Sequence, residues 1–291
     1  MISVRNETIR SPNEHEGGKV AALRGGSPTR RFFWLVGVIL VLALGGRGEG
    51  AWAGEDLIEA AGYRDLATVR SLLNSGANVN RADKFGRTPL IAAAFKGHAD
   101  VVKLLLAHGA NVNRADTFGL TPLYWATLFG YVNVVKLLLA NGADVNRANK
   151  NGGTPLIAAA YNGHADVAKI LLAHGANVNL ANKNGLTPLF LAAYYNHADV
   201  VKILLAHEAN VNQPDKSGKT PLSLAASQGH ADVVKLLLAH GANVNQPDKS
   251  GKTPLSLAAS QGHADVVKIL LAHGAKPTNS VPSQKGQLES H

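Results

Sequence analysis

The tripeptide Thr-Pro-Leu occurs six times in this chain, and each copy begins 33 residues after the one before it. The copies begin at Thr88, Thr121, Thr154, Thr187, Thr220 and Thr253. A fixed period of this size, without insertions, predicts a solenoid of stacked units, none of which buries its apolar face alone. This period constrains the fold more than the length of 291 residues, which would allow one large domain or two ordinary ones.

A single unit shows the local structure that the period implies. Thr88 is suited to cap a helix, and Pro89 to occupy its first turn, where a missing N–H costs nothing. Gly97 is suited to end that helix in the left-handed conformation. The apolar residues of the segment 101–106 predict a second helix that Gly109 ends. We expect two helices and an outward-pointing hairpin loop in every unit.

The repeated unit resembles the ankyrin repeat. The resemblance rests on D-x-x-G-x-T-P-L at 83–90, on Gly-His at 97–98 and on V-V-K-L-L-L-x-H-G-A-N-V-N at 101–113, and it covers about residues 55–275. It implies an all-α repeat solenoid of stacked helix-turn-helix units with short β-hairpin loops. One departure is consistent: the His that usually follows Thr-Pro-Leu is replaced by Ile91, Tyr124, Ile157, Phe190, Ser223 and Ser256.

The 33-residue register also sets the domain boundaries. A degenerate unit, with Glu55 and Asp56 in place of Thr-Pro, predicts an N-terminal capping repeat over 54–81, followed by six repeats over 82–276. Segments 213–242 and 246–275 differ only at Leu236 and Ile269, so the last repeat carries no polar capping changes. The polar segment 277–291 lacks periodicity, and we expect it to be disordered.

The segment 1–53 has the order of parts typical of a secretory signal peptide. A basic region precedes 13 residues without a polar side chain, from Phe32 to Leu44. At 1.5 Å per residue this run spans about 20 Å, less than a bilayer core of about 30 Å. Ala51-Trp52-Ala53 then matches the small-x-small pattern of a cleavage site, which predicts Gly54 as the first mature residue.

The route of export and the fate of the leader stay open at this point. Residues 29–35 resemble the twin-arginine motif but depart from it at Trp34, whereas the strong hydrophobicity of the run favours the general secretory route. An uncleaved inner-membrane anchor is the alternative to cleavage. Either way we expect the protein to be exported, to the periplasm or the outside of a bacterial cell.

The sequence offers no constellation for catalysis. The chain has no Cys, no G-x-S-x-G context for a nucleophilic Ser and no phosphate-binding Gly-rich loop. Ten His form two columns along the repeats, but members of a column lie about one repeat apart, too far for one ion at about 2.0–2.1 Å per ligand. We therefore expect no enzyme activity, no cofactor, no metal and no small-molecule substrate, and we interpret these His as hydrogen-bonded helix ends.

The repeats differ at positions that the ankyrin resemblance places on the concave face and the hairpin tips. In repeats two to five these positions hold aromatic and apolar side chains, whereas the last two repeats carry Lys, Ser and Gln there. Exposed aromatic residues at this density are typical of interfaces. We predict that a protein partner contacts Phe85, Arg87, Phe95, Lys96, Phe118, Leu120, Leu128, Phe129, Tyr161, Asn162, Tyr194 and Tyr195. We expect Trp125 and Phe190 to pack between repeats instead.

The hairpin edge is basic, which suggests the charge of the partner. Eleven Lys and Arg face only four Asp there, so an acidic protein is the natural complement. Nucleic acid is an unlikely partner, because export removes the protein from most of it. The alternative function is a membrane-anchored structural array whose Lys-rich surface contacts anionic membrane, with the N-terminal segment as its only span.

Three finer expectations concern the scaffold. Glu208 occupies a column that is otherwise Gly, so we expect a strained left-handed backbone there, and less strain at Asn196 in the other helix-stop column. Five Asp stand three residues before a Lys of the second helices and predict i,i+3 ion pairs. We also expect the His to accept hydrogen bonds and to destabilise the fold when protonated.

Overall fold

A computed structural model of the chain describes residues 57–277. This part of the chain holds fourteen helices, paired in sequence, and no strand. The pairs are α3 (Leu57–Gly62) with α4 (Leu66–Asn74), α5 (Pro89–Lys96) with α6 (Ala99–Ala107), α7 (Pro122–Leu128) with α8 (Val132–Ala140), α9 (Pro155–Asn162) with α10 (Ala165–Ala173), α11 (Pro188–Tyr194) with α12 (Ala198–Ala206), α13 (Pro221–Gln228) with α14 (Ala231–Ala239), and α15 (Pro254–Ser260) with α16 (Ala264–Ala272).

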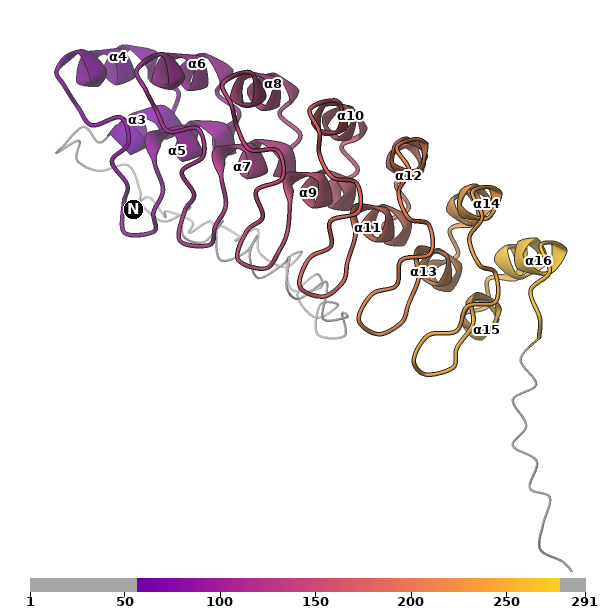
Figure 1. Ribbon diagram of the computed structural model, residues 1–291. Coiled ribbons are helices and arrows are strands. Elements are labelled where there is room, and N and C mark those ends of the chain that lie inside the picture. The colour runs from indigo at the N-terminus through magenta and orange to yellow at the C-terminus, as the bar shows by residue number, and fades with distance from the viewer. Residues whose placement is uncertain (1–56, 278–291) are drawn as a thin grey trace, which may run out of the picture. The chain divides into compact units, whose positions relative to one another are not determined.

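Within this unit the first helices of the pairs lie side by side in one row, and the second helices lie side by side in another (Figure 1). This arrangement confirms the all-α repeat solenoid. The expectations for the leader 1–53, for its cleavage site at Ala51, Ala53 and Gly54, and for the tail from 278 onward lie outside the described residues.

The Thr-Pro pairs start the first helices as the sequence predicts. Thr88 Oγ1 accepts a hydrogen bond from the amide of Ile91 at 3.2 Å, and Pro89 occupies the first helical position of α5. The same cap begins α7, α9, α11, α13 and α15. In α13, Ser223 completes a capping box, since its Oγ accepts from the Thr220 amide at 3.0 Å. Each cap of this kind stabilises its helix by about 1 kcal/mol.

Left-handed residues end the helices in both helix-stop columns. Gly97 has φ of 76°, and Asn196 takes its place in repeat five with φ of 62°. Glu208 has φ of 63°, which confirms the expected left-handed backbone. A Cβ added to Gly109, of the same column as Glu208, would meet nothing within 4 Å, so the Glu208 side chain has room. The strain at Glu208 therefore lies in the backbone alone, at about 1–2 kcal/mol.

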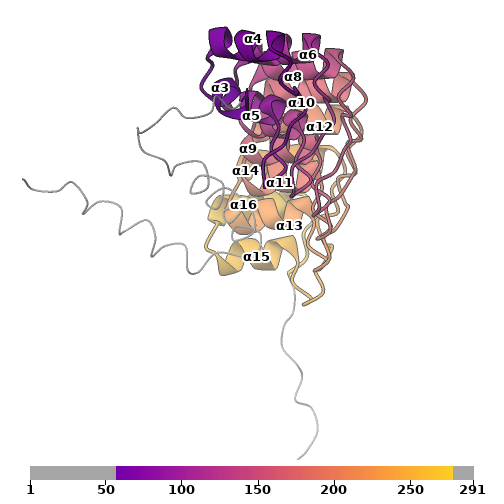
Figure 2. The same cartoon turned by 90° about the vertical axis from the view of Figure 1, so that its left-hand side faces the viewer.

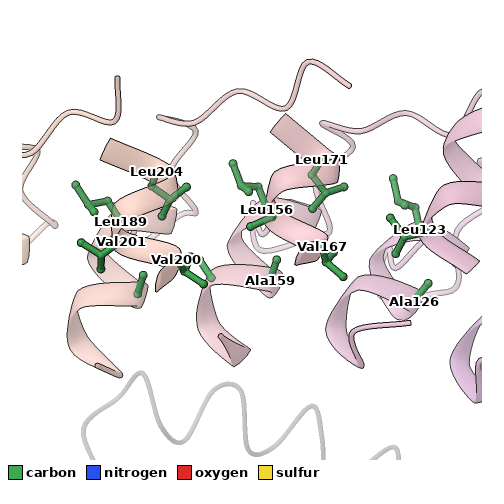
Figure 3. Close-up of a cluster of buried hydrophobic side chains, with 14 of the residues drawn as sticks. Leu123, Ala126, Leu156, Ala159, Val167, Leu171, Leu189, Val200, Val201 and Leu204 are labelled. Carbon is green, nitrogen blue, oxygen red and sulfur yellow. The ribbon is translucent and has the colours of Figure 1, made fainter. Parts of the chain in front are cut away.

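One apolar core runs along the array between the two rows of helices. Leu156 and Ala159 of α9 pack with Val167 and Leu171 of α10, and the neighbouring pairs contribute the same column positions (Figure 3). All four side chains are buried. Small Ala residues let the helices approach closely, while Leu and Val fill the space between them. Successive pairs thus bury a continuous core that no single pair could form.

Asparagine side chains clamp each repeat to the next one. Asn113 Nδ2 donates to the carbonyl of Gly142 at 3.0 Å, and Asn113 Oδ1 accepts from the amide of Asp144 at 2.8 Å. The same two bonds recur from Asn80 to Asn245. At Glu208 the corresponding donor bond, from Asn179, lengthens to 3.5 Å. The strained turn thus coincides with the weakest of these clamps.

The hairpin loops leave the array on one side and follow one another along it (Figure 1, Figure 2). Each loop closes on itself, as when the Asp83 amide donates to the Arg87 carbonyl at 3.0 Å. Each tip also bonds to the next, as when the Thr117 amide donates to the Phe85 carbonyl at 3.0 Å. The loops are hairpin-like turns joined by single backbone bonds, and this ladder fixes the tips relative to one another.

Candidate partner-binding surface

The tips of repeats two and three present exposed phenyl rings. Phe85 and Phe118 are 37% and 44% exposed. Asp83 Oδ1 holds the first tip by accepting from the amides of Phe85 and Arg87 at 2.8 and 2.9 Å. Lys84 Nζ and Arg87 Cζ lie 5.1 and 5.4 Å from the centroid of the Phe85 ring, within cation–π range. This tip therefore combines apolar area with two cations.

A first group of rings lies at the ends of α5 and α7. The centroid of Phe95 lies 5.2 Å from Trp125 and 5.1 Å from Phe129, both edge-on. Phe129 also stacks near Tyr131, at 5.9 Å between centroids. Phe129 remains 43% exposed while Phe95 is half-buried, so the group packs internally and still offers a ring face to solvent. Lys96 Nζ lies 5.4 Å from the Phe95 centroid and adds a cation.

Trp125 ties this ring group to the neighbouring tip. Its side chain is buried, and its indole N–H donates to Asp116 Oδ2 at 3.2 Å. Asp116 Oδ1 in turn accepts from the amides of Phe118 and Leu120. Burial raises the pKa of Asp116, although these hydrogen bonds favour its charged form. One carboxylate thus positions both the exposed Phe118 and the ring group.

A second group of rings lies at the ends of α9 and α11. The centroid of Tyr195 lies 4.7 Å from Tyr161 and 4.7 Å from Tyr194, edge-on in both cases. The three rings are half-buried and pack against a small cluster that includes Ile157 and Phe190. The aromatic side chains predicted on the first helices of repeats two to five therefore form two packed groups, one in repeats two and three and one in repeats four and five.

One of the twelve predicted contact residues is wrong. Leu120 is only 2% exposed, so its buried side chain has no surface to offer a partner. Leu128 and Asn162 are half-buried beside the rings, and Lys96 is exposed. Trp125 and Phe190 are buried, which confirms that they pack between repeats.

Sequence reasoning missed Tyr131 as a member of the first ring group. The signal was present, because Tyr131 stands in the column that His98, His164 and three further His occupy. A Cβ added to Gly97 would meet the Tyr131 ring at 2.9 Å. In the same column the His164 ring faces Gly130. A ring stacked on the left-handed glycine of the preceding repeat is thus a structural feature of the column, and Tyr131 extends it into the surface group.

The two His columns bind backbone carbonyls, so the expectation that they accept hydrogen bonds is wrong. His164 Nε2 lies 3.1 Å from the carbonyl oxygen of Leu128 in the preceding repeat. His174 Nδ1 lies 2.8 Å from the carbonyl oxygen of Ile170. A carbonyl oxygen only accepts, so these nitrogens carry the proton and donate. The structure confirms that these His side chains make hydrogen bonds at helix ends. Protonation of the other ring nitrogen does not break the bond to the carbonyl oxygen.

Burial of His230 still predicts that the stability of the fold depends on pH, as the sequence suggested for the His columns. Desolvation lowers the pKa of His230, and the Tyr194 carbonyl that accepts from it only partly opposes this. The neighbouring His197 and His263 lower the pKa further when they are charged.

Between residues 57 and 277 no group of three or more His, Asp or Glu is placed to hold a metal ion.

Ion pairs on the second helices follow the predicted spacing in part. Lys169–Asp166, Lys202–Asp199 and Lys235–Asp232 are pairs at 3.8, 3.6 and 3.4 Å. Asp100 instead pairs with Arg64 of the first repeat at 2.9 Å. Partial burial opposes this charge, but the hydrogen bonds from Arg64 and from the Val101 amide, together with the positive charge of Arg64, outweigh burial, and the pKa of Asp100 is lowered. These exposed pairs contribute about 0–1 kcal/mol each.

The comparisons with known proteins identify the class of the fold. The chain matches the family of ankyrin repeats (3 copies) at residues 57–149, 142–215 and 208–280. These matches together span most of the chain, so the protein belongs to the ankyrin repeat family. Ankyrin repeats are generally protein-interaction modules. Among curated proteins no relative matches the chain. No helix within 57–277 is long and apolar enough to cross a membrane.

Proposed function

We propose that this ankyrin array binds a protein partner through the two ring groups and the neighbouring hairpin tips. The observation that carries the proposal is the location of the rings. Phe95, Phe129, Tyr161, Tyr194 and Tyr195 gather at the ends of the first helices in repeats two to five, and they stay partly exposed although each packs against other rings. Aromatic side chains that are rigid and partly exposed are the usual anchors of protein interfaces.

The same positions in the last two repeats support this assignment by contrast. Ser227 and Ser260 stand in the column that holds Phe95 in repeat two. Gln228 and Gln261 stand in the column that holds Phe129 in repeat three. The helices there begin with the same threonine N-caps, to which Ser223 and Ser256 add capping boxes, and have the same seven or eight residues. The rings are therefore not needed for the repeat to fold, and partner binding gives them a role.

The experiment is capture of a partner by the immobilised chain from the exported fraction of its own cell. The wild-type chain is compared with Phe129→Ala/Tyr194→Ala and with the matched control Gln228→Ala/Gln261→Ala. The proposal expects one protein to be retained by the wild type and the control and lost with the ring variant. Retention by all three chains would place the contact elsewhere.

We further propose that the protein is exported and that its leader is removed after Ala53. The support is the order of basic segment, short apolar run and small-x-small site in the sequence. Replacing Ala53 with a bulky residue should leave a species about 6 kDa larger, at roughly 110 Da for each leader residue. Mass measurement of the mature N-terminus tests this: Gly54 first supports export with cleavage, and a retained leader supports the membrane-anchored alternative.

A further inference from the structure

The hairpin tips of the last four repeats carry an unbroken column of lysines, at Lys150, Lys183, Lys216 and Lys249. All four side chains are exposed. Each backbone amide donates to a carbonyl of the preceding tip, at 3.1, 2.9, 3.2 and 3.0 Å in that order. The backbone positions that carry the four cations are therefore joined in a ladder, which fixes the interval between these positions. We call these four residues the tip lysines.

The carboxylates near the tip lysines are held by hydrogen bonds within their own turns. Asp215 Oδ1 accepts from the amides of Ser217 and Lys219 and from the Ser217 hydroxyl. Asp248 is buried and makes the same bonds in the last repeat. In the two repeats before them, neutral Asn149 and Asn182 hold the turn. Among the ion pairs of the described residues none includes a tip lysine.

The interval between the tip lysines follows from the hydrogen bonding. Each loop folds back on itself and then bonds to the next loop, so one repeat adds two backbone spacings. Hydrogen-bonded extended segments lie about 4.7–4.9 Å apart, so we expect successive tip lysines to lie about 9.5 Å apart. The spacing of 8–10 Å between packed helix axes agrees with this interval.

An interval of about 9.5 Å selects one conformation of an extended ligand. In a polyproline II helix every third side chain lies on the same side, and three residues rise about 9.3 Å. In a β-strand the third residue rises about as far but points to the opposite face. A polyproline II segment with an acidic residue at every third position would therefore place one carboxylate at each tip lysine.

The residues beside the tip lysines suit the same ligand. Asn151 and Asn184 directly follow the first two tip lysines and carry side-chain amides, whereas the Ser217 and Ser250 hydroxyls that follow the other two already donate to Asp215 and Asp248. The polyproline II backbone has no internal hydrogen bonds and keeps its carbonyls free to accept. An α-helix has no such need, because its backbone groups are paired internally. The amides of Asn151 and Asn184 therefore favour the polyproline II ligand over an acidic helix.

We propose that the tip lysines of repeats four to seven bind an extended, polyproline II-like protein segment with an acidic residue at every third position. This inference deepens the proposed function and rests on it. The segment runs along the hairpin edge, away from the exposed Phe85 and Phe118 of the first tips. One partner would thus present apolar groups to the rings of repeats two to five and acidic residues to the tips of repeats four to seven.

The test uses the full chain and two labelled twelve-residue peptides at low ionic strength. One is (Glu-Pro-Pro) repeated four times; the other has the same composition with its glutamates grouped in two adjacent pairs. Fluorescence anisotropy should show the period-three peptide binding at least tenfold more tightly. Each tip lysine changed to Gln should weaken that binding about 1.5- to fivefold, in the range of exposed ion pairs. Lys169→Gln, an exposed cation on α10, should change nothing.

Equal affinity of the two peptides, or equal loss with Lys169→Gln, would overturn the proposal. So would an oligothymidylate of equal charge, or a helical peptide with a glutamate every seventh residue, that binds as tightly as the period-three peptide. Failure here is distinguishable from failure of the proposed function. A captured partner that still binds a chain with all four tip lysines changed to Gln refutes the lysine inference and leaves the ring interface standing.

Discussion

Repeats two to five and the last two repeats share one scaffold but differ in surface. The hydrogen bond from the capped amide to the threonine Oγ1 is 3.2 Å long in repeats two and six. The bond from the His Nε2 to the carbonyl oxygen is 3.1 Å long in repeats four and seven. The ends of the first helices differ completely, with packed rings in one region and Ser and Gln in the other. Positions that hold the stack together are thus uniform, and the variation lies where a partner could reach.

This contrast separates residues that build the array from residues that use it. Trp125 shows that the two roles can meet, since its ring is buried while its indole N–H fixes Asp116 beneath an exposed tip. Phe129, one turn away, remains 43% exposed. Substitutions at the two positions should therefore give opposite patterns of stability and binding.

The largest effect is expected from Trp125→Ala. Loss of a buried aromatic ring should lower the free energy of unfolding by about 3–5 kcal/mol, and the Asp116 carboxylate loses its indole donor. Leu257→Ala, in the same column of the last repeat, should cost less because the open end of the array can relax. Denaturant unfolding measures both. A smaller loss at Trp125 than at Leu257 would contradict the account of the ring group as packed structure.

The second-largest effect is expected from Phe129→Ala, which should change partner binding more than the stability of the fold. Phe129→Ala should weaken partner binding by about 2 kcal/mol or more, the usual threshold for an interface anchor. Its cost in stability should stay well below that of Trp125→Ala, because nearly half of the ring is in solvent. Gln261→Ala, at the same position of the last repeat, should leave both quantities unchanged. An unfolding loss of 3–5 kcal/mol for Phe129→Ala would make this ring core instead.

Glu208→Gly tests whether the turn at residue 208 is the one strained turn in a column that is otherwise glycine. Removing the side chain relieves a left-handed backbone and should raise the free energy of unfolding by about 1–2 kcal/mol. The Asn179 bond to the 208 carbonyl should shorten from 3.5 Å toward the 3.1 Å seen at Gly241. Gly241→Ala is the control and should destabilise the protein. Unchanged stability for Glu208→Gly would mean that the neighbouring turn already absorbs the strain.

The smallest effect concerns pH. Burial lowers the pKa of His230 below its unfolded value of about 6.5, so the folded state binds fewer protons between the two pKa values. Stability is therefore fully present above about pH 6.5 and falls as pH drops through the folded-state pKa. His230→Gln keeps a donor toward the Tyr194 carbonyl and should flatten this slope in thermal melts. A wild-type melting temperature that stays constant from pH 8 to pH 5 would refute the account.

The sequence predicted the scaffold well because its signals are local. Thr88 with Pro89, the helix-stop glycines and the left-handed Glu208 each depend on the conformation of a few neighbouring residues. Arg64 escaped prediction: its φ of 63° occurs in the degenerate first repeat, and its bond to Asp100 joins residues 36 positions apart.

The candidate surface was less predictable because it depends on packing between repeats. The sequence predicted the column positions of Phe95 and Phe129, but it did not predict that their rings contact each other. Leu120 stands in the same column as exposed Lys252, yet it is buried beneath its tip. Which side chains turn inward is decided by the neighbouring repeat, and the period of one chain does not encode that choice.

The most direct test of the central claim measures partner binding and stability on the same three chains. These are the wild type, Phe129→Ala/Tyr194→Ala and Gln228→Ala/Gln261→Ala, each titrated with the captured partner and unfolded in denaturant. The account predicts that only the ring variant loses binding, by at least 2 kcal/mol, the anchor threshold, while it remains folded at the temperature of the titration. Binding that survives in the ring variant, or that is lost equally in the Gln variant, would contradict the claim that the rings of repeats two to five form the interface.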